Sequence, residues 1–217
     1  RDEAAFEHLW RRIGLSYDWS LQYATIDEGA RRASQLSFLK LVEKGQVYHT
    51  VYPGMWDVDF KTAIAQAEIE DREVPGAFHD VIFGVEGGGE FMISTTRPEL
   101  LASCIAVVAH PEDARYRALF GKRAVTPLFH APVPIQPSEH ADPEKGSGIM
   151  MICTFGDIVD VEFWKRSGLP LKQLFSPEGR ILPVKHGTAG FESLRPDLAD
   201  QAAAALAGLT IKQAQKK

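Results

Sequence analysis

Two hydroxyl groups, a guanidinium and a carboxylate are concentrated in residues 95–99, Thr-Thr-Arg-Pro-Glu. The apolar residues 91–93 come directly before them and are typical of a buried strand. Thr96 and Glu99 have the spacing of a capping box, and Pro98 suits the first turn of a helix, so the pattern predicts a short helix that begins here. The unpaired N–H groups at its start would favour a developing negative charge. The alternative is that Thr96 and Glu99 cap the helix and do nothing else.

A second group of polar residues follows the apolar run 149–153, where Asp157 and Asp160 stand one helical turn apart. Asp157 is a suitable N-cap for a helix predicted over residues 158–166. A second carboxylate on the same face adds repulsion unless a cation or a donor meets it, and the ammonium group of a ligand would do so. Asp160 is therefore either a surface residue or an anion that binds such a ligand.

Other site chemistries have weaker support in the sequence. Asp57 and Asp59 lack a third ligand for a metal ion. The glycines at 87–89 lack the Lys-Ser/Thr of a phosphate-binding loop, and they are predicted to form a hairpin turn. Cys104 and Cys153 have no paired metal spacing and are too few for a disulfide framework, which is typical of a reducing cytoplasm.

The elements that must position these residues change character along the chain. Amphipathic patterns predict helices over residues 3–13 and 27–44. After a charged run at 68–73 and Pro75-Gly76, short apolar runs are separated by glycine and proline. Strands are expected at 47–52, 81–85, 91–94, 105–109, 133–135 and 149–153, a hairpin at 174–181, and further helices at 111–120 and 195–206. The predicted fold class is α+β, with a helical segment and connector at 1–75 followed by a β-barrel-like domain with peripheral helices at 76–217.

Length and composition limit the function further. A chain of 217 residues can form one large domain, or one domain and an appendage. The net charge of −5 argues against a protein that coats nucleic acid by charge, although it permits one that grips the end of an RNA. No apolar stretch is long enough to cross a bilayer, and no signal peptide is visible. Because the chain opens at Arg1 directly in a helical pattern, we expect it to be a piece of a larger protein.

Taken together, the two polar groups resemble the editing domain inserted in class I aminoacyl-tRNA synthetases. Glu99 and the His-Pro-Glu-Asp at 110–113 favour the valyl type, because leucyl enzymes typically carry Asp after Thr-Thr-Arg-Pro and isoleucyl enzymes an aromatic residue. The resemblance also includes Arg-Tyr at 115–116, Gly-Lys at 121–122, Gly-Ser-Gly at 146–148 and the Asp-x-x-Asp at 157–160. Residues 6–48 are similar to the segment before the insertion, so the resemblance covers nearly the whole chain.

The resemblance implies an activity that removes a charging error. In valyl enzymes an apolar pocket that accepts valine rejects threonine by only about a hundredfold, so a second site must hydrolyse the ester of threonyl-tRNA for valine. The expected catalytic residues are Asp160, which would bind the α-ammonium group, and Thr95 and Thr96, which would surround the terminal adenosine and the attacking water. With no general base in sight, catalysis would rest on positioning, assisted by the terminal ribose hydroxyl. Further substrate contacts are expected from Arg97, Glu99, Leu100, Met151, Cys153, Phe155 and Asp157.

The resemblance also implies partners and cofactors. The partners would be the acceptor end of the mischarged tRNA and the rest of a cytoplasmic, monomeric synthetase that ligates valine to its tRNA. Editing would need no cofactor, whereas ATP and Mg²⁺ would serve a synthetic site whose His-Ile-Gly-His and Lys-Met-Ser-Lys motifs this chain lacks. No zinc is expected, because Trp56-Asp57 stands where relatives often carry a Trp-Cys-Pro-x-Cys knuckle.

Several pocket residues depart from the family pattern. Leu100 and Cys153 stand where the family usually has threonine, and Met151 stands where bacterial valyl enzymes often have lysine. Residues 154–156, Thr-Phe-Gly, replace the common Pro-x-His. These changes predict a reshaped or weakened site. Two alternatives therefore stay open, a leucyl- or isoleucyl-type editing domain and a module that binds the tRNA acceptor end without hydrolysing it.

Overall fold

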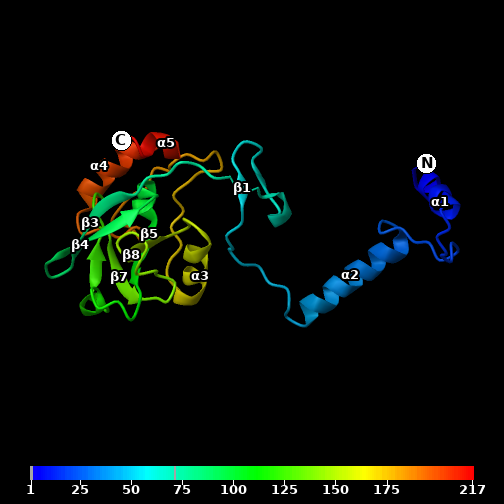
Figure 1. The fold of residues 1–217 in the computed structure, drawn as a ribbon, viewed down its shortest axis with the longest axis horizontal. Coiled ribbons are helices and arrows are strands. Elements are labelled where there is room, and N and C mark those ends of the chain that lie inside the picture. The colour runs from blue at the N-terminus through cyan, green and yellow to red at the C-terminus, as the bar shows by residue number, and fades with distance from the viewer. Residues whose placement is uncertain (1, 71) are drawn as a thin grey trace. The chain divides into compact units, whose positions relative to one another are not determined.

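The computed structural model describes residues 2–70 and 72–217, and the chain divides into two compact units, Arg1–Tyr52 and Pro53–Lys217 (Figure 1). Within the charged run at 68–73, Asp71 lies outside the described residues. The boundary between the two compact units lies just before the connector at 53–75. The functional boundary after residue 75 stays a prediction.

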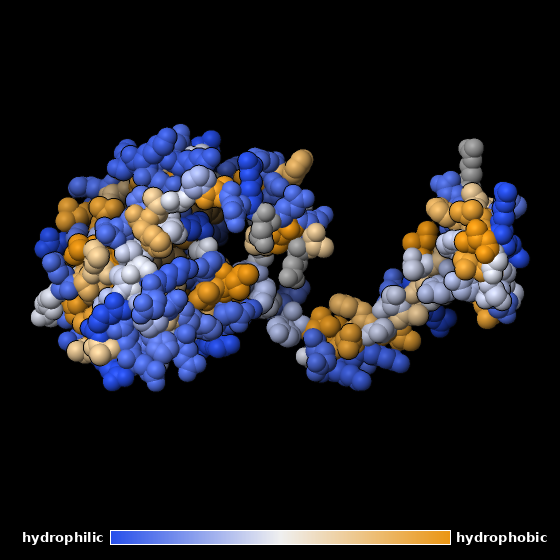
Figure 2. All heavy atoms as spheres, in the orientation of Figure 1, coloured by the Kyte–Doolittle hydropathy of each residue, from blue (hydrophilic) through white to orange (hydrophobic). Residues whose placement is uncertain are grey.

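The first unit consists of two helices, α1 (Asp2–Arg12) and α2 (Glu28–Glu43), which confirms both predicted helices. Asp27 is the N-cap of α2, and its carboxylate accepts a 2.7 Å hydrogen bond from the backbone N–H of Ala30. The predicted strand at 47–52 is wrong: this segment has no regular structure, because an extended segment without a neighbouring strand to pair with is not stable alone. Figure 2 shows hydrophobic side chains on the surface of this unit, and those of Leu36, Phe38 and Leu39 on α2 are about half exposed.

The second unit is built around a six-stranded sheet, which confirms the α+β class. Its strands are β3 (His79–Val85), β4 (Glu90–Thr95), β5 (Cys104–Ala109), β6 (Arg123–Val125), β7 (Pro132–Pro137) and β8 (Ile149–Cys153). They lie in the order β4-β3-β6-β7-β5-β8, and all neighbours are antiparallel except β5 and β7. The backbone N–H of Ser94 on β4 donates to Ser147 Oγ just before β8, 3.1 Å away. The two edge strands therefore approach each other and the sheet is nearly closed into a barrel (Figure 1).

Helices cover this sheet on both faces. Ala199 and Ala203 of α4 (Pro196–Leu206) pack against one core cluster, and Phe163 of α3 (Ile158–Ser167) packs against the other. Every residue of β5 is buried because this strand lies between them. The remaining short elements are α5 (Ile211–Ala214), β1 (Trp56–Asp57), β2 (Thr62–Ala63) and the 3-10 helices η1 (Gln66–Glu68), η2 (Pro98–Ser103) and η3 (Arg117–Leu119). No helix in the described residues is long and apolar enough to span a membrane.

The predicted helix over residues 111–120 is wrong. This segment consists of turns followed by the single 3-10 turn η3. The Asp113 carboxylate accepts the backbone N–H of Arg115 at 3.0 Å and pairs with its guanidinium at 2.6 Å. A side chain that bonds the backbone two residues ahead competes with helix formation, so these contacts replace the first helical turn.

Candidate functional site

A pocket of about 490 Å³ lies where the end of β4, the end of β8 and the start of α3 meet. Most of the residues singled out from the sequence line it. These are Thr95, Thr96, Arg97, Leu100, Met151, Cys153, Asp157 and Asp160. Two predicted contacts, Glu99 and Phe155, do not line this pocket.

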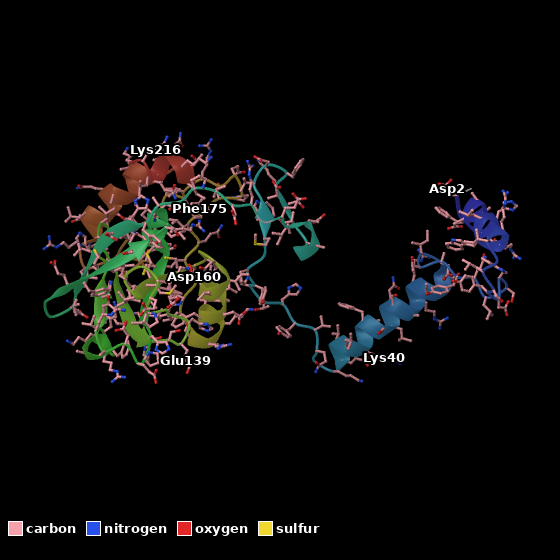
Figure 3. The ribbon with its side chains drawn as sticks, viewed as in Figure 1. Asp2, Lys40, Glu139, Asp160, Phe175 and Lys216 are labelled. Atoms are coloured by element: carbon pink, nitrogen blue, oxygen red, sulfur yellow. The ribbon has the colours of Figure 1, made fainter. Side chains whose placement is uncertain are left out.

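Asp160 is a buried carboxylate in the first turn of α3, with 5 % of its surface exposed (labelled in Figure 3). Its Oδ2 accepts a 2.7 Å hydrogen bond from the backbone N–H of Gly156. Burial is the main cause that raises the pKa of Asp160 to about 7, and the negative charge of Asp157 adds to it, whereas the Gly156 N–H opposes the rise. No cationic side chain in the described residues forms an ion pair with this carboxylate, so its ionised form has no ion-pair partner among them.

Asp157 has the capping role that its position predicts. Its Oδ1 accepts the backbone N–H of Asp160 at 3.0 Å, and its backbone is extended, as an N-cap requires. The Asp157 side chain is exposed at the pocket rim. The two carboxylates therefore have different environments, one solvated and one buried.

The predicted capping box at Thr96 and Glu99 is wrong. The helix that follows is the 3-10 helix η2, its N-cap residue is Arg97, and no side chain caps it. Glu99 is turned inward, and its side chain is fully buried against the Nε of Arg97, 2.9 Å away. Its carboxylate is thus engaged in an ion pair and is not available to the backbone N–H groups at the helix start.

Arg97 connects the two polar groups of the sequence. Its Nη1 donates a 2.7 Å hydrogen bond to the backbone oxygen of Gly156, which is 59 residues away in the chain. Gly156 therefore contacts Arg97 through its C=O and Asp160 through its N–H. The guanidinium lines the pocket, but its Nε and Nη1 groups already donate hydrogen bonds to Glu99 and Gly156.

The hydroxyl groups at the end of β4 differ in their availability. Thr95 Oγ1 accepts the backbone N–H of Arg97 at 3.1 Å, which fixes the turn into η2. Thr96 is exposed, and its hydroxyl makes no hydrogen bond with another described residue. Thr96 is therefore the freer of the two to contact a ligand.

One wall of the pocket is apolar. It is formed by Leu100, Met151 and Cys153, which are all less than 10 % exposed. Burial is the main cause that raises the pKa of the Cys153 thiol well above its usual value, so this group stays protonated. Phe155 packs edge-on against Trp164, with ring centroids 5.3 Å apart, and is not a pocket residue.

A supporting loop, residues 142–148, forms another side of the pocket, and sequence reasoning did not find how it is held. Arg115 donates to the Pro143 oxygen at 2.8 Å, and the Tyr116 hydroxyl donates to the Ser147 oxygen at 2.7 Å. The Arg-Tyr pair at 115–116 is part of the resemblance, and this is the signal in the sequence that could have pointed to these contacts. Rim residues that the sequence analysis missed are Phe78, His140, Asp142 and Lys145.

Gly148→Ala is expected to destabilise this loop. Gly148 has φ +77°, and a Cβ there would overlap the Arg115 guanidinium and lie 2.9 Å from the Pro143 oxygen. Gly121→Ala is the matched control, because φ is +82° and no atom lies within 4 Å. We expect the free energy of unfolding to fall by about 2–4 kcal/mol for Gly148→Ala and by about 1 kcal/mol for the control, measured by urea titration. Equal losses would contradict the close packing of Arg115 over this glycine.

Metal ligands do not cluster in the described residues: no three His, Cys, Asp or Glu side chains lie where they could hold an ion together. The pocket contains carboxylate, hydroxyl and guanidinium groups beside an apolar wall. This combination can bind a cationic ligand and orient polar groups around a reacting bond.

The sequence profile of the tRNA synthetases class I (I, L, M and V) matches residues 2–207. A valine--tRNA ligase of Thermobifida fusca is 48 % identical over 216 residues, which are 100 % of this chain and 24 % of that protein. A valine--tRNA ligase of Salinispora arenicola is 53 % identical over 182 residues, 84 % of this chain and 21 % of that protein. The chain thus spans about a quarter of the length of these relatives.

Among solved structures, the chain is similar to the LeuRS of Agrobacterium radiobacter K84 in a ternary complex with tRNA and LeuAMS. The sequence identity is 20 % and the TM-score is 0.38, over 92 % of this chain and 33 % of that one.

Proposed function

The chain belongs to the class I tRNA synthetases (I, L, M and V), and on that premise we propose that its second unit is an editing domain that hydrolyses the ester of threonyl-tRNA for valine. The names of the relatives support the valyl type over the leucyl and isoleucyl types. The partners would be the acceptor end of that tRNA and the remaining parts of a valine–tRNA ligase. The reaction would take place in the cytoplasm, on a monomer.

The observation that carries the proposal is the buried Asp160 carboxylate, which lines the pocket and forms no ion pair with a cationic side chain of the described residues. An aminoacyl ester carries a free α-ammonium group, and this cation would supply the missing charge. Binding would stabilise the ionised form of Asp160 and lower its pKa from about 7. The carboxylate would then hold the amino acid in one orientation.

Hydrolysis would be promoted by the way the pocket positions the water and the ester. Water attacks the ester carbonyl, the bond to the ribose oxygen breaks, and the ribose oxygen takes up a proton. The exposed Thr96 hydroxyl and the part of the Arg97 guanidinium that faces the pocket are the groups suited to orient the water and the developing oxyanion. No cofactor is needed for this step, and ATP and Mg²⁺ would serve only the synthetic site of the whole enzyme.

Discrimination between threonine and valine has to come from the polar side of the pocket. Leu100 and Met151 offer no hydrogen bond, and the Cys153 thiol is a weak donor. An apolar wall cannot strongly reject one of two side chains of the same shape, whereas a hydroxyl that binds the threonine hydroxyl can. We assign that contact to Thr96.

A second candidate is a module that binds the acceptor end without hydrolysing it. The observation that favours it is the apolar wall, because hydroxyl or amine groups of the family pattern are replaced there by Leu100, Met151 and Cys153. Such a module would bind the terminal adenosine and its amino acid, but hydrolysis would stay at the background rate.

A crystal structure with a non-hydrolysable threonyl-adenosine analogue tests the proposed site. We expect its ammonium group within hydrogen-bond distance of Asp160 and its threonyl hydroxyl beside Thr96. The matched control is a des-amino analogue. This analogue should bind at least about tenfold more weakly, because it lacks the cation. An ammonium group bound elsewhere, or equal affinity for both analogues, would overturn the assignment.

A further inference from the structure

The Glu99 carboxylate is completely buried although it does not line the pocket. Each of its oxygens has one side-chain donor. Oε1 accepts from the Nε of Arg97 at 2.9 Å, and Oε2 accepts from the Nε2 of Gln215, also at 2.9 Å. Gln215 directly follows α5 and is separated from Glu99 by 116 residues in the sequence.

These contacts continue into the pocket. The guanidinium that Glu99 holds donates through Nη1 to the oxygen of Gly156, and the N–H of the same glycine donates to Asp160. The space at Gly156 is tight, since a Cβ there would lie 2.5 Å from Asp160 Oδ2 and 3.1 Å from Leu100 Cδ1. Because the Gly156 N–H is hydrogen-bonded to Asp160 Oδ2 at 2.7 Å, a displacement of Gly156 shifts the position of the carboxylate.

We propose that Gln215 and Glu99 are positioning residues, which hold Arg97 on the Gly156 carbonyl and thereby fix where the Asp160 carboxylate stands in the pocket. The consequence for ester hydrolysis rests on the proposed function, but the consequence for Asp160 does not. Gln215 lies outside every motif of the sequence analysis, and α5 thus becomes part of the support of the site.

The physical reason is the cost of a buried carboxylate oxygen without a donor. Removing one partner of such a group costs its desolvation, so Glu99 would rotate toward solvent or another donor and draw the guanidinium away from Gly156. A cation at position 215 can replace the amide donor. A second carboxylate at this position repels Glu99 and competes for Arg97.

Three substitutions separate this role from simple support of α5: Gln215→Ala, Gln215→Lys and Gln215→Glu. Lys212→Ala is the matched control, because Lys212 is exposed on α5 and its side chain makes no hydrogen bond or ion pair with a described residue. For each variant of the full-length protein, the Asp160 carboxyl carbon is titrated by NMR, and kcat and KM are measured for threonyl-tRNA hydrolysis. Thermal melting reports any general loss of stability.

In this titration, the signal of Asp160 has to be distinguished from the signals of the titratable groups around it. Asp157 and Cys153 face it directly, and Arg97 faces it across Gly156. His140, Asp142 and Lys145 line the same pocket. Selective labelling of aspartate carboxyl carbons, with Asp160→Asn to assign the signal, isolates the one group in question.

We expect Gln215→Glu to raise the Asp160 midpoint by at least about 0.5 pH unit, since a displaced Gly156 N–H no longer stabilises the ionised form. It should lower kcat/KM about tenfold, chiefly through kcat, with about threefold for Gln215→Ala and less than twofold for Gln215→Lys. Equal midpoints in the Glu, Ala and Lys variants would overturn the proposal. If wild-type protein hydrolyses no aminoacyl-tRNA, the proposed function fails, and the titration alone still decides on the positioning role.

Discussion

Asp160→Asn is expected to abolish the proposed editing activity and, at the same time, to make the protein more stable. The substitution removes the charge that would bind the ammonium group, while the amide oxygen can still accept the Gly156 N–H. We expect kcat/KM for threonyl-tRNA hydrolysis to fall about 100- to 1,000-fold, the cost of removing one partner of a buried charge pair. In wild-type protein, kcat/KM should rise with pH through about 7 as Asp160 ionises.

The raised pKa of Asp160 determines how the stability gain depends on pH. Asp160 has a pKa of about 7 in the folded state, against 3.8 as its ordinary value, so the folded state binds more protons between these values. The wild-type free energy of unfolding therefore falls as pH rises from about 4 to 7 and loses nothing more from this group above 7. Asparagine does not titrate. The variant should be more stable than wild type by about 2–4 kcal/mol at pH 8 and lose that advantage near pH 4.

Asp157→Asn is the matched control for this effect. Asp157 is exposed, and asparagine is as good an N-cap as aspartate, so α3 keeps its first hydrogen bond. Urea titrations at pH 4, 6 and 8 should show a change of less than about 0.5 kcal/mol for this variant. If the stability difference between Asp160→Asn and wild type is the same at pH 8 and at pH 4, ionisation of the buried Asp160 carboxylate does not destabilise the folded state.

Gly156→Ala is expected to damage the site without a backbone penalty. Gly156 has no positive φ, so alanine can adopt its conformation, but the added Cβ would lie 2.5 Å from Asp160 Oδ2. The carboxylate has to move. A misplacement of about 1 Å in a positioning contact costs about 100-fold in kcat/KM. We also expect a loss of about 1–3 kcal/mol in the free energy of unfolding from overpacking.

Gly76→Ala is the control for this substitution, since Gly76 also lacks a positive φ and no atom lies within 4 Å of the added Cβ. It should leave both activity and stability near the wild-type values. In the double variant Gly156→Ala, Asp160→Asn, the two losses of activity should not add, because both act on one carboxylate. Additive losses would show that Gly156 acts on the reaction by a route other than Asp160.

Local rules predicted those parts of the fold that depend on neighbouring residues. The N-caps at Asp27 and Asp157 follow from backbone hydrogen bonding within a few residues. The same rules were wrong at Glu99, where the Arg97 guanidinium competes for the carboxylate, and at Asp113, where Arg115 does. In both cases an ion pair displaced the local bond that the pattern predicts.

The pocket wall could be predicted from the order of its motifs, but the contacts between the motifs could not. The bond from Arg97 to Gly156 spans 59 residues, and the bond from Gln215 to Glu99 spans 116. Neither produces a periodicity or a spacing in the sequence, since each depends on how β8, η2 and α5 meet in three dimensions. The pKa of Asp160 could not be predicted for the same reason, because it is set by burial.

Comparing the deacylation of threonyl-tRNA and valyl-tRNA for valine tests the central claim most directly. Each ester, labelled in its amino acid, is incubated with wild-type protein and with Asp160→Asn, and the remaining aminoacyl-tRNA is counted over time. We predict that wild-type protein hydrolyses the threonyl ester at least about 100-fold faster than the valyl ester, and that Asp160→Asn leaves both at the background rate. Hydrolysis of both esters at one rate, or threonyl hydrolysis that survives the loss of Asp160, would contradict the account.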